Sequence, residues 1–597
     1  NGSWHDPHDF EISTYRYPCP SVIVYAVPCH VLCESGIGPL NLISEAAAAH
    51  RCPCRSLRIM LLPLSVALLS VEGFARLSEI TVYVGMFLFI IFLIWRCFKK
   101  PPVYEIPARD ISKGHRWSVT DILSRTGYCS ICENLIVDGL FCDSCGICVD
   151  HGCRSAADKS VLCKILSCTG SAIKHHWVKG NTSPNSLCTV CEKLCGLEAA
   201  LVDFRCCWCQ RTIHTKCADQ LGDVCDLGSH RAFVVPPFCV RLRMVGWKGR
   251  RHLVVKEVAR PPFNPWNPLI VVANRKSGNN DGEVILSVFR GILNPAQVID
   301  LDELPPESAL EWCHLIQDHV CRVLVAGGDG TVNWVFTAMD KLKLQPPPPL
   351  CVLPLGTGND FARVFGWGEG YSSSDINALD ILNSLNRARI QKIDRWKIHI
   401  SPQRRLGFAP PCQEMFMTNY ASVGVDALVT LNFHKTRESW LYLWKHRFFN
   451  KLLYFTYGTR DILEKKCKNL HQKVRLWLDN EEVGLQELEA ITVLNIPSWG
   501  AGVRPWHMGA GGQLAQPQRC DDGLLEVIGL YSSFHVAQLQ IGMSEPIRLG
   551  QAREVRMELS ERLPMQVDGE PWEQAPATLS FTFHCQASVL VNQSGQL

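Results

Sequence analysis

Two glycine-rich segments in the middle of the chain have the residue types that bind phosphate. GGDGT at residues 327–331 follows the apolar run 323–326, and GTGND at residues 356–360 follows the apolar run 351–355. A strand that ends in glycines before a helix begins presents backbone N–H groups to an anion, and glycine allows the anion to come close. We therefore predict two phosphate-binding turns, followed by helices that begin near Val332 and Phe361.

A third apolar run, residues 269–273, ends in NRKSG at residues 274–278, which offers polar donors and two cations to a polyphosphate. Runs that are apolar on both faces are typical of parallel strands, and parallel sheets bind ligands at the carboxyl ends of their strands. Asp329 would repel phosphate unless a divalent cation lay between them, so Mg²⁺ is expected. The chain has no Walker A, HRD or DFG sequence, which excludes P-loop NTPases and protein kinases.

Cysteines form a second candidate site, because 16 of the 30 fall between Cys129 and Cys225. In the second half of this block, Cys-x2-Cys pairs and two histidines occur at zinc-ligand spacing: His175, Cys188, Cys191, Cys206, Cys209, His214, Cys217 and Cys225. Thiolate and imidazole are the ligands that Zn²⁺ prefers, whereas the histidines would have no role in a disulfide framework. Thiolates that hold zinc must stay reduced, which indicates the cytosol.

The first half of the block repeats the same order of ligands with two departures: His115, Cys129, Cys132, Cys142, Cys145, Cys153 and Cys163. Nine residues separate Cys132 from Cys142 in place of fourteen, and Asp150 stands where the second histidine is expected. A carboxylate oxygen can bind zinc, so Asp150 is one candidate, and a small register shift would bring in His151 or Cys148. We expect zinc here, but not tight lipid binding.

Sixteen residues without a charge, 80–95, precede Arg96, Lys99 and Lys100. A helix of this length spans roughly 24 Å against about 30 Å of hydrocarbon. We predict a membrane anchor over residues 77–98, either spanning or re-entrant with part of 59–71, with a buried core helix as the alternative. The positive-inside rule then places the rest of the chain in the cytosol. Residues 1–76 remain unassigned, and the first residue, Asn1, suggests an incomplete N-terminus.

The remaining sequence indicates how these sites are positioned. The 597 residues correspond to roughly four domains, and a net charge of +3 gives no global field for nucleic acid. Residues 241–251 form a basic connector before the parallel strands. Beyond about Cys412, alternating runs such as 474–478 and 524–528 predict a mostly antiparallel β region. Residues 441–458, aromatic and basic, form either a core-packed helix or a membrane-facing surface.

Together these motifs resemble the diacylglycerol kinases. The matching sequences are GGDGT, PLGTGND at 354–360, DRW at 394–396, NYxSVG at 419–424, DDG at 521–523 and QVDGEPW at 566–572. The cysteine block, with His-x-Trp at 175–177, resembles the C1 domains of protein kinase C and diacylglycerol kinases. The resemblance covers about 109–587. Two C1 modules, no EF-hand loop and an N-terminal apolar segment are most similar to the epsilon type.

The resemblance implies a multidomain fold. Its parts are an N-terminal hydrophobic membrane segment, an atypical C1 domain at 112–165, a second C1 domain at 174–226, an α/β nucleotide-binding catalytic domain at 265–400 and a β-sandwich-like accessory domain at 412–590. Interleaved zinc ligation would give one site of His175, Cys206, Cys209 and Cys225, and another of Cys188, Cys191, His214 and Cys217.

The implied activity is transfer of the ATP γ-phosphate to the 3-hydroxyl of 1,2-diacyl-sn-glycerol. The product, phosphatidic acid, would end diacylglycerol signalling and feed phosphatidylinositol resynthesis. The expected cofactors are ATP, Mg²⁺ and structural Zn²⁺, and the expected partners are diacylglycerol and membrane lipids. The expected location is the endoplasmic reticulum or the plasma membrane. The alternatives are a sphingoid-base or NAD kinase of the same fold, and a non-catalytic C1 adaptor that binds diacylglycerol.

Roles follow for the individual residues. The nucleotide-binding candidates are Asn274, Ser277, Gly278, Gly327, Gly328, Gly330, Thr331, Gly356, Thr357, Gly358, Asn359 and Asp360. Asp329 would organise Mg²⁺ or act as the base, and Asp568 and Glu570 are the rival metal or base carboxylates. Asp521 and Asp522 are either a second Mg²⁺ site or a solvated turn. The sequence leaves the choice between Asp329 and Glu570 as proton acceptor open.

Overall fold

The computed structural model describes residues 81–92, 104–110, 114–120, 127–183, 185–198, 200–247, 251–278, 281–316, 321–371, 376–403, 411–438, 467–508 and 516–593. The chain divides into two units, Asn1–Pro101 and Pro102–Leu597. In the first unit, residues 81–92 form a helix with exposed side chains, and residues 1–76 lie outside the described part. None of the described helices is both long and apolar enough to cross a membrane. The anchor over residues 77–98 therefore stays a prediction.

The second unit begins with two small cysteine-rich modules. In the first module, residues 112–165, strands β2 (Trp117–Thr120), β3 (Gly139–Cys142) and β4 (Cys148–Asp150) form an antiparallel sheet followed by helix α3 (Arg154–Ser160). In the second module, residues 174–226, β6 (Trp177–Lys179), β7 (Phe204–Cys206) and β8 (Thr212–Ile213) form a similar sheet, and β5 (Ile173–Lys174) pairs with β9 (Val224–Cys225). Cysteines make up much of each small core, which is typical of domains stabilised by metal.

Residues 241–251 are not a simple connector. Strand β10 (Val240–Val245) turns back into β11 (His252–Val258), and β11 also pairs with β1 (Ile106–Ala108), so the three form an antiparallel sheet. Val254 and Val255 are buried in this sheet, whereas Arg241, Arg243 and Lys256 are exposed.

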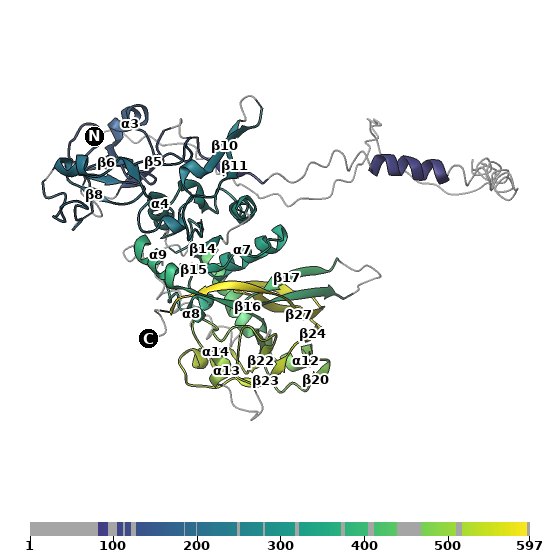
Figure 1. Ribbon diagram of the computed structural model, residues 1–597. Helices are drawn as coiled ribbons and strands as arrows, with labels where there is room; N and C mark the ends of the chain where they lie inside the picture. Colours follow the sequence, from purple (N-terminus) through teal and green to yellow (C-terminus); the bar gives the residue numbers. More distant parts are fainter. Residues whose placement is uncertain are drawn as a thin grey trace, which may run out of the picture. The chain divides into compact units, whose positions relative to one another are not determined.

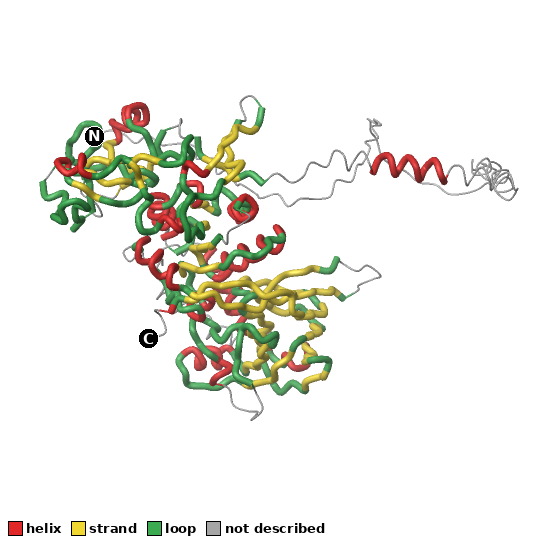
Figure 2. The backbone as a smooth tube through the Cα atoms, in the orientation of Figure 1, coloured by secondary structure: helices red, strands yellow, loops and turns green. Residues whose placement is uncertain are grey.

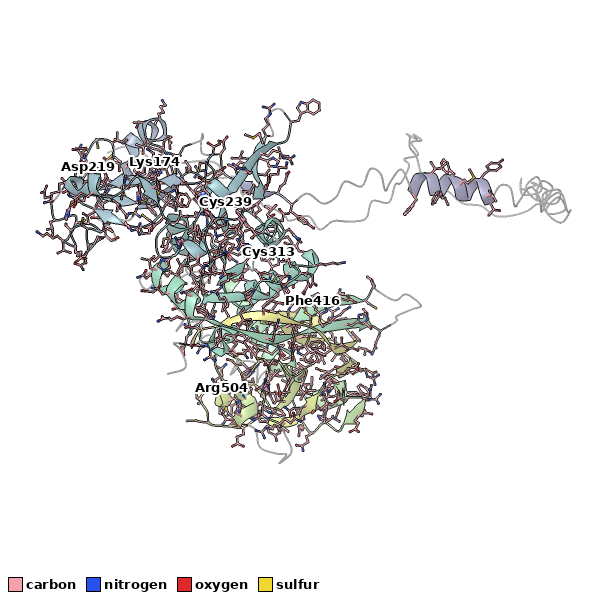
Figure 3. The ribbon with its side chains drawn as sticks, in the orientation of Figure 1. Lys174, Asp219, Cys239, Cys313, Phe416 and Arg504 are labelled. Atoms are coloured by element: carbon pink, nitrogen blue, oxygen red, sulfur yellow. The ribbon has the colours of Figure 1, made fainter. Side chains whose placement is uncertain are left out.

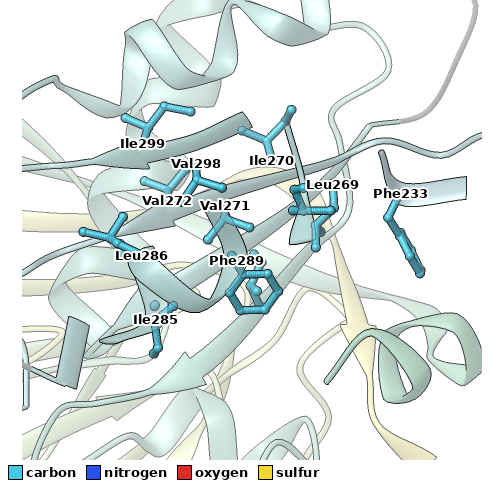
Figure 4. Packing of buried hydrophobic residues seen from close by; sticks show 14 of the residues in the cluster. Phe233, Leu269, Ile270, Val271, Val272, Ile285, Leu286, Phe289, Val298 and Ile299 are labelled. Atoms are coloured by element: carbon cyan, nitrogen blue, oxygen red, sulfur yellow. The ribbon is translucent and has the colours of Figure 1, made fainter. Parts of the chain in front are cut away.

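The nucleotide half, residues 265–400, contains the expected parallel sheet in the order β13 (Val298–Asp300), β12 (Leu269–Ala273), β14 (Arg322–Gly327) and β15 (Leu350–Pro354). All five residues of β12 are buried, and Leu286 and Phe289 of helix α4 (Asp281–Ile292) belong to the same core (Figure 4). Helices α5 (Pro306–Leu310), α6 (Trp312–Leu315), α7 (Asp329–Leu342), α8 (Asp360–Val364) and α9 (Ala378–Arg387) complete this half. The parallel strands and the turn-to-helix order are as predicted.

The sheet does not stop at the expected domain boundary. Strand β27 (Ala577–Val591) lies beside β15, with Val589 opposite Leu350, and runs antiparallel to β16 (Arg389–Pro402) (Figure 1). The sheet continues into β24 (Val555–Leu559), β19 (Val474–Leu478) and β20 (Glu481–Val483), while β17 (Gln413–Met417) pairs with β16. Because β16 and β27 are 14 and 15 residues long, they serve both halves.

A second sheet of six antiparallel strands completes the sandwich half, residues 412–590 (Figure 2). Its order is β23 (Ile547–Ala552), β22 (Leu525–Leu530), β21 (Ala490–Leu494), β18 (Tyr420–Gly424), β25 (Leu563–Val567) and β26 (Glu570–Gln574). Val423 and Val527 of this sheet share one core with Ile398, Leu476 and Phe581 of the first sheet, which confirms the expected two-sheet packing. Helices α10 (Val425–Glu438), α12 (Leu470–Lys473), α13 (Pro505–Met508) and α14 (Ser533–Gln540) belong to this half. Residues 441–458 lie outside the described residues.

Candidate active site

The two predicted phosphate turns lie against each other. A Cβ atom added to Gly356 would lie 2.8 Å from the Cα of Gly328, so neither position accepts a larger residue without displacement of the other turn. The backbone N–H of Leu355 also donates to the carbonyl of Gly327 at 3.0 Å. The remaining polar and glycine candidates of these turns are partly exposed, which leaves them available to a ligand: Gly330, Thr331, Thr357 and Gly358.

The third turn joins them. The backbone N–H of Asn274 donates to the carbonyl of Ala326 at 3.1 Å, and a Cβ added to Gly278 would lie 3.2 Å from the carbonyl oxygen of Leu355. Gly278 has φ +66°, which glycine adopts at little cost. Ser277, partly exposed, donates its N–H to the Asn274 carbonyl at 3.0 Å. The expected convergence of three strand-to-glycine turns is therefore present.

The two cations of this third turn do not have the expected role. Arg275 pairs with Asp300, with Nη2 2.8 Å from Oδ2, and Lys276 pairs with Asp302, with Nζ 3.0 Å from Oδ1. Asp300 is the last residue of β13, the neighbouring strand, and Asp302 follows it. These ion pairs position the turn on the sheet, whereas the sequence suggested that the cations bind polyphosphate directly.

Asp329, the first residue of α7, connects the two glycine motifs. Its Oδ2 accepts the backbone N–H of Asp360 at 3.0 Å, and its Oδ1 accepts that of Phe361 at 3.1 Å, so it caps the start of α8. Burial and, secondarily, the negative charge of Asp360 raise the pKa of Asp329 to about 7. A carboxylate with a pKa near neutrality can both accept and release a proton at physiological pH, as a general base requires.

Asp360 makes contacts that no local sequence pattern indicates. Its side chain is buried, and its Oδ1 accepts the hydroxyl of Ser498 at 2.5 Å and the N–H of Gly502 at 3.0 Å. Its Oδ2 accepts the N–H of Ala501 at 3.1 Å. Asp360 therefore connects the nucleotide half to a loop of the sandwich half, and this favours a positioning role over the nucleotide or metal contact expected from the sequence.

Asn359 fixes the shape of the second turn. It adopts φ +54° at the start of α8, and its Nδ2 donates to the carbonyls of Gly356 and Glu369, both at 2.8 Å. Its buried Oδ1 has no hydrogen-bond partner among the described residues. Because a buried acceptor without a partner is costly, a ligand that donates a hydrogen bond to Oδ1 would be stabilised here.

Asp568 differs from the catalytic role considered for it. It lies in the turn between β25 and β26 with φ +49°, and its buried carboxylate accepts the backbone N–H groups of Thr418 at 2.9 Å, Asn419 at 2.7 Å and Tyr420 at 3.1 Å. Burial raises its pKa to about 6. With three backbone donors on its two oxygens, Asp568 holds the start of β18 in place.

The carboxylate of Glu570, two residues later, is exposed, whereas that of Asp568 is buried. Its Oε1 would lie 2.7 Å from a Cβ added to Gly330, so it lies against the first turn of α7. A carboxylate of the sandwich half thus lies at the helix end where the phosphate turns converge. Such oxygen ligands fit a Mg²⁺–phosphate complex.

The described residues of the cysteine modules include four groups of four ligands, from His, Cys or Asp, whose ligand atoms all lie within 4.8 Å of one another. In the second module they are the two interleaved sets expected from the resemblance. In the first module they are His115, Cys142, Cys145 and Cys163, and Cys129, Cys132, Asp150 and Cys153. Asp150 is therefore the residue that the structure brings to the site, whereas His151 faces Asp138 at 3.3 Å.

The geometry of these groups fits tetrahedral zinc. Sulfur–nitrogen distances are 3.2 Å for Cys191–His214 and 3.3 Å for Cys145–His115, and the sulfur–sulfur distance is 3.6 Å for Cys142–Cys163. Ligands at about 2.0–2.3 Å from a tetrahedral centre lie roughly 3.3–3.8 Å apart. The second nitrogen of His115 also contacts the carbonyl of Val161 at 3.0 Å, as metal-bound histidines do.

The first module is attached to the nucleotide half by buried charges that sequence reasoning missed. Lys164 is 1% exposed, and its Nζ donates to the carbonyls of Arg290 at 3.2 Å, Gly291 at 2.9 Å and Leu293 at 2.8 Å, at the end of α4. Asp143 accepts Nη1 of Arg290 at 2.9 Å. Cations at a helix C-terminus are favourable, so this contact anchors the module to α4.

Three parts of the chain match known families. Residues 268–398 match the diacylglycerol kinase catalytic domain, residues 416–571 match the diacylglycerol kinase accessory domain, and residues 175–228 match the phorbol esters/diacylglycerol binding domain, or C1 domain. The chain is 33% identical over 520 residues to probable diacylglycerol kinase 3 of Caenorhabditis elegans, which covers 80% of this chain and 64% of that protein. It is 34% identical over 462 residues to human diacylglycerol kinase zeta, which covers 70% of this chain and 49% of that protein.

The chain thus spans 64% and 49% of the length of these two relatives. Among solved structures, a putative diacylglycerol kinase from Bacillus anthracis is 15% identical with a TM-score of 0.34, and the match covers 55% of this chain and 97% of that one. Yeast NADH kinase in complex with NADH is 10% identical with a TM-score of 0.31, over 59% and 89% of the two chains. On the matches in sequence, the chain carries a C1 domain followed by the catalytic and accessory domains of the diacylglycerol kinase family.

Proposed function

We propose that this chain is an ATP-dependent lipid kinase that transfers the γ-phosphate of ATP to the 3-hydroxyl of 1,2-diacyl-sn-glycerol, giving phosphatidic acid. The observation that carries the proposal is that Glu570 of the sandwich half lies against Gly330 at the start of α7, where Asp329 connects the paired glycine turns. The domain matches and the curated relatives, which are diacylglycerol kinases, support the same activity.

The residues divide the work of phosphoryl transfer as follows. The backbone of 327–331 and 356–358 and the N-terminus of α7 bind the phosphates, and Asn359 Oδ1 accepts a donor of the nucleotide. Mg²⁺, when held by Glu570, would neutralise phosphate charge. Asp329, with its pKa near 7, accepts the proton of the incoming hydroxyl, while Asp360 joins the two halves and Asp568 holds the start of β18.

The cysteine modules add structural zinc and a lipid contact to this proposal. The second module, which matches the C1 domain, would bind diacylglycerol, and the first would be a repeat of it that retains both zinc sites through Asp150. The epsilon-type assignment belongs to the proposal, as does a membrane location at the endoplasmic reticulum or plasma membrane through the apolar segment 77–98, with the catalytic region in the cytosol.

A panel of acceptors tests the proposal against its alternatives. The purified chain, supplied with ATP and Mg²⁺, should phosphorylate diacylglycerol in mixed micelles and leave sphingosine and NAD unmodified. Phosphorylation of sphingosine or NAD alone would select a different kinase of the same fold. Binding of diacylglycerol without any phosphorylated product would select the adaptor.

A further inference from the structure

The β10–β11 hairpin exposes a large aromatic side chain that the fold does not use. Trp247 follows the last paired residue of β10, Val245, and is 81% exposed, and Met244 is 50% exposed. Strand β1 pairs with β11 only from Leu253 to Val255, so the turn end of the hairpin has no β1 residue beside it (Figure 1). Exposing an indole and a thioether to water is unfavourable, which indicates a partner for this end of the hairpin.

Basic side chains lie along both faces of the same hairpin. Arg241, Arg251 and Lys256 are exposed and have no ion pair among the described residues, while Arg243 pairs with Glu105. Glu257 is the single acidic residue of β10 and β11. The hairpin therefore carries a local positive charge in a chain whose net charge is only +3.

Protection of a sheet edge explains only part of this composition. Strand β10 is the edge strand of its sheet, and arginines on an edge strand prevent pairing with another chain. That purpose accounts for Arg241 and Arg243. It does not account for Trp247, because a large exposed aromatic side chain promotes association rather than preventing it.

We propose that this hairpin docks turn end first on an anionic membrane surface, with Trp247 at the turn end and Arg241, Met244, Arg251 and Lys256 on its two faces. Tryptophan is enriched at the lipid–water interface because its ring is apolar and its N–H is polar, and lysine and arginine are attracted to anionic headgroups. The combination of an indole, a thioether and three unpaired cations at one hairpin matches both parts of such a surface. An acidic protein or a nucleic acid would satisfy the cations but would leave Met244 and Trp247 without an apolar environment.

The hairpin is rigidly joined to the catalytic region. Val254 and Val255 of β11 and Ile106 of β1 are buried, and Ile106 and Val255 belong to the same hydrophobic core as β12 of the nucleotide half. Docking of the hairpin would therefore hold the nucleotide half close to a lipid surface. The inference concerns lipid contact and not phosphoryl transfer, so its test needs neither ATP nor activity.

The test must read the hairpin itself, since the C1 domain is proposed to bind lipid as well. Hydrogen–deuterium exchange of the full chain would be followed for peptides covering 240–258, on phosphatidylcholine vesicles and on vesicles in which about one lipid in five is phosphatidylserine. We expect these amides to exchange more slowly on the anionic vesicles. Equal exchange on both vesicles, or protection by a soluble polyanion but not by vesicles, would overturn the proposal.

Matched variants make the test specific. Removing three cations (Arg241→Gln, Arg251→Gln and Lys256→Gln) should raise the vesicle concentration for half-protection roughly a hundredfold, and Trp247→Ala roughly tenfold. The controls remove the same kinds of group from the sandwich half and from β16: Lys468→Gln with Arg553→Gln and Arg562→Gln, and Ile390→Ala, whose side chain is 58% exposed. Loss of protection in the controls as large as in the hairpin variants would also contradict the proposal.

Discussion

The carboxylate of Asp329 accepts the backbone N–H of Asp360 at 3.0 Å, which joins the first residue of α7 to the first residue of α8. The side chain of Asp360 in turn accepts the hydroxyl of Ser498 and the N–H of Gly502 in the sandwich half. The candidate base, the second phosphate turn and the second half of the catalytic region are thus connected by consecutive hydrogen bonds.

Replacement of Asp360 by alanine should damage the site without removing any group that touches the substrate. The change leaves the donors of Ser498, Ala501 and Gly502 without an acceptor, and an unpaired donor that is buried, as the hydroxyl of Ser498 is, costs about 1–3 kcal/mol. We expect a lower melting temperature together with reduced activity. The control Ser498→Ala, which removes one of these hydrogen bonds, should have about a third of the effect on stability. Equal stability of Asp360→Ala and the wild type would contradict the positioning role.

Glu570 and Asp568, which lie two residues apart, should respond in opposite ways to loss of charge. Glu570→Gln changes an exposed carboxylate above Gly330, so we expect a loss of about 10²-fold or more in kcat with an unchanged melting temperature. Asp568→Asn places amide hydrogens against backbone donors and should lower the melting temperature first. Initial rates and thermal unfolding of both variants measure these effects. A lower melting temperature in Glu570→Gln, together with a loss of kcat alone in Asp568→Asn, would assign the catalytic role to Asp568 and the structural role to Glu570.

Zinc content should distinguish the ligands of the first module. The wild type should contain about four zinc ions per chain, one for each of the four ligand groups. Asp150→Ala removes one ligand of an exposed site and should lower the count towards three, whereas the matched changes His151→Ala and Cys148→Ala should leave it near four. Metal analysis by mass spectrometry after dialysis provides the count. A loss of zinc in His151→Ala but not in Asp150→Ala would show that His151, and not Asp150, is the zinc ligand.

A buried carboxyl outside the active site should make stability depend on pH. Glu526 of β22 is fully buried and accepts hydrogen bonds from Gln518 at 2.8 Å and Gln551 at 3.0 Å, and burial raises its pKa from 4.5 to about 8. Between these two values the folded state binds the proton and the unfolded state does not, so the free energy of unfolding falls as the pH rises.

We therefore expect Glu526 to contribute a loss of about 2 kcal/mol in the free energy of unfolding between pH 6 and pH 8. Glu526→Gln, which mimics the protonated acid, should remove this part of the slope, whereas Glu481→Gln at an exposed position of β20 should keep it. Urea unfolding at the two pH values measures the difference. Identical slopes for the wild type and Glu526→Gln would show that Glu526 is not protonated in the folded state.

The parts of this protein that the sequence predicted are those encoded by local patterns. Ligand spacing identified the eight ligands of the second module and offered Asp150 as one candidate beside His151 and Cys148, whereas the resemblance to C1 domains divided the eight ligands into two sets. Apolar runs before glycines identified β12, β14 and β15 and the convergence of their turns, because parallel strands end at one edge of a sheet.

The contacts that the sequence did not predict join residues far apart in the chain. Three such contacts depend on how whole elements pack: Lys164 with the end of α4, Asp360 with the loop 498–502, and β27 with β15. The periodicity of the sequence does not indicate such packing. Asp568 and Glu570 could not be separated from the sequence alone, since a turn carboxylate gives the same signal when it accepts backbone N–H groups as when it faces a ligand. The backbone carbonyl of Phe416 in β17, which accepts Nδ2 of Asn333 of α7 at 3.1 Å, makes another contact of this kind (Figure 3).

The central claim is that Asp329 serves a kinase that phosphorylates diacylglycerol, and one measurement tests it most directly. The initial rate of phosphatidic acid formation from ATP and micellar diacylglycerol would be compared between the wild type and Asp329→Asn, with Asp380→Asn of α9 as the control. We predict rapid formation by the wild type and the control, and a loss of about 10²–10⁴-fold in Asp329→Asn. Wild-type protein that forms no phosphatidic acid, or Asp329→Asn that forms it at the wild-type rate, would contradict the account.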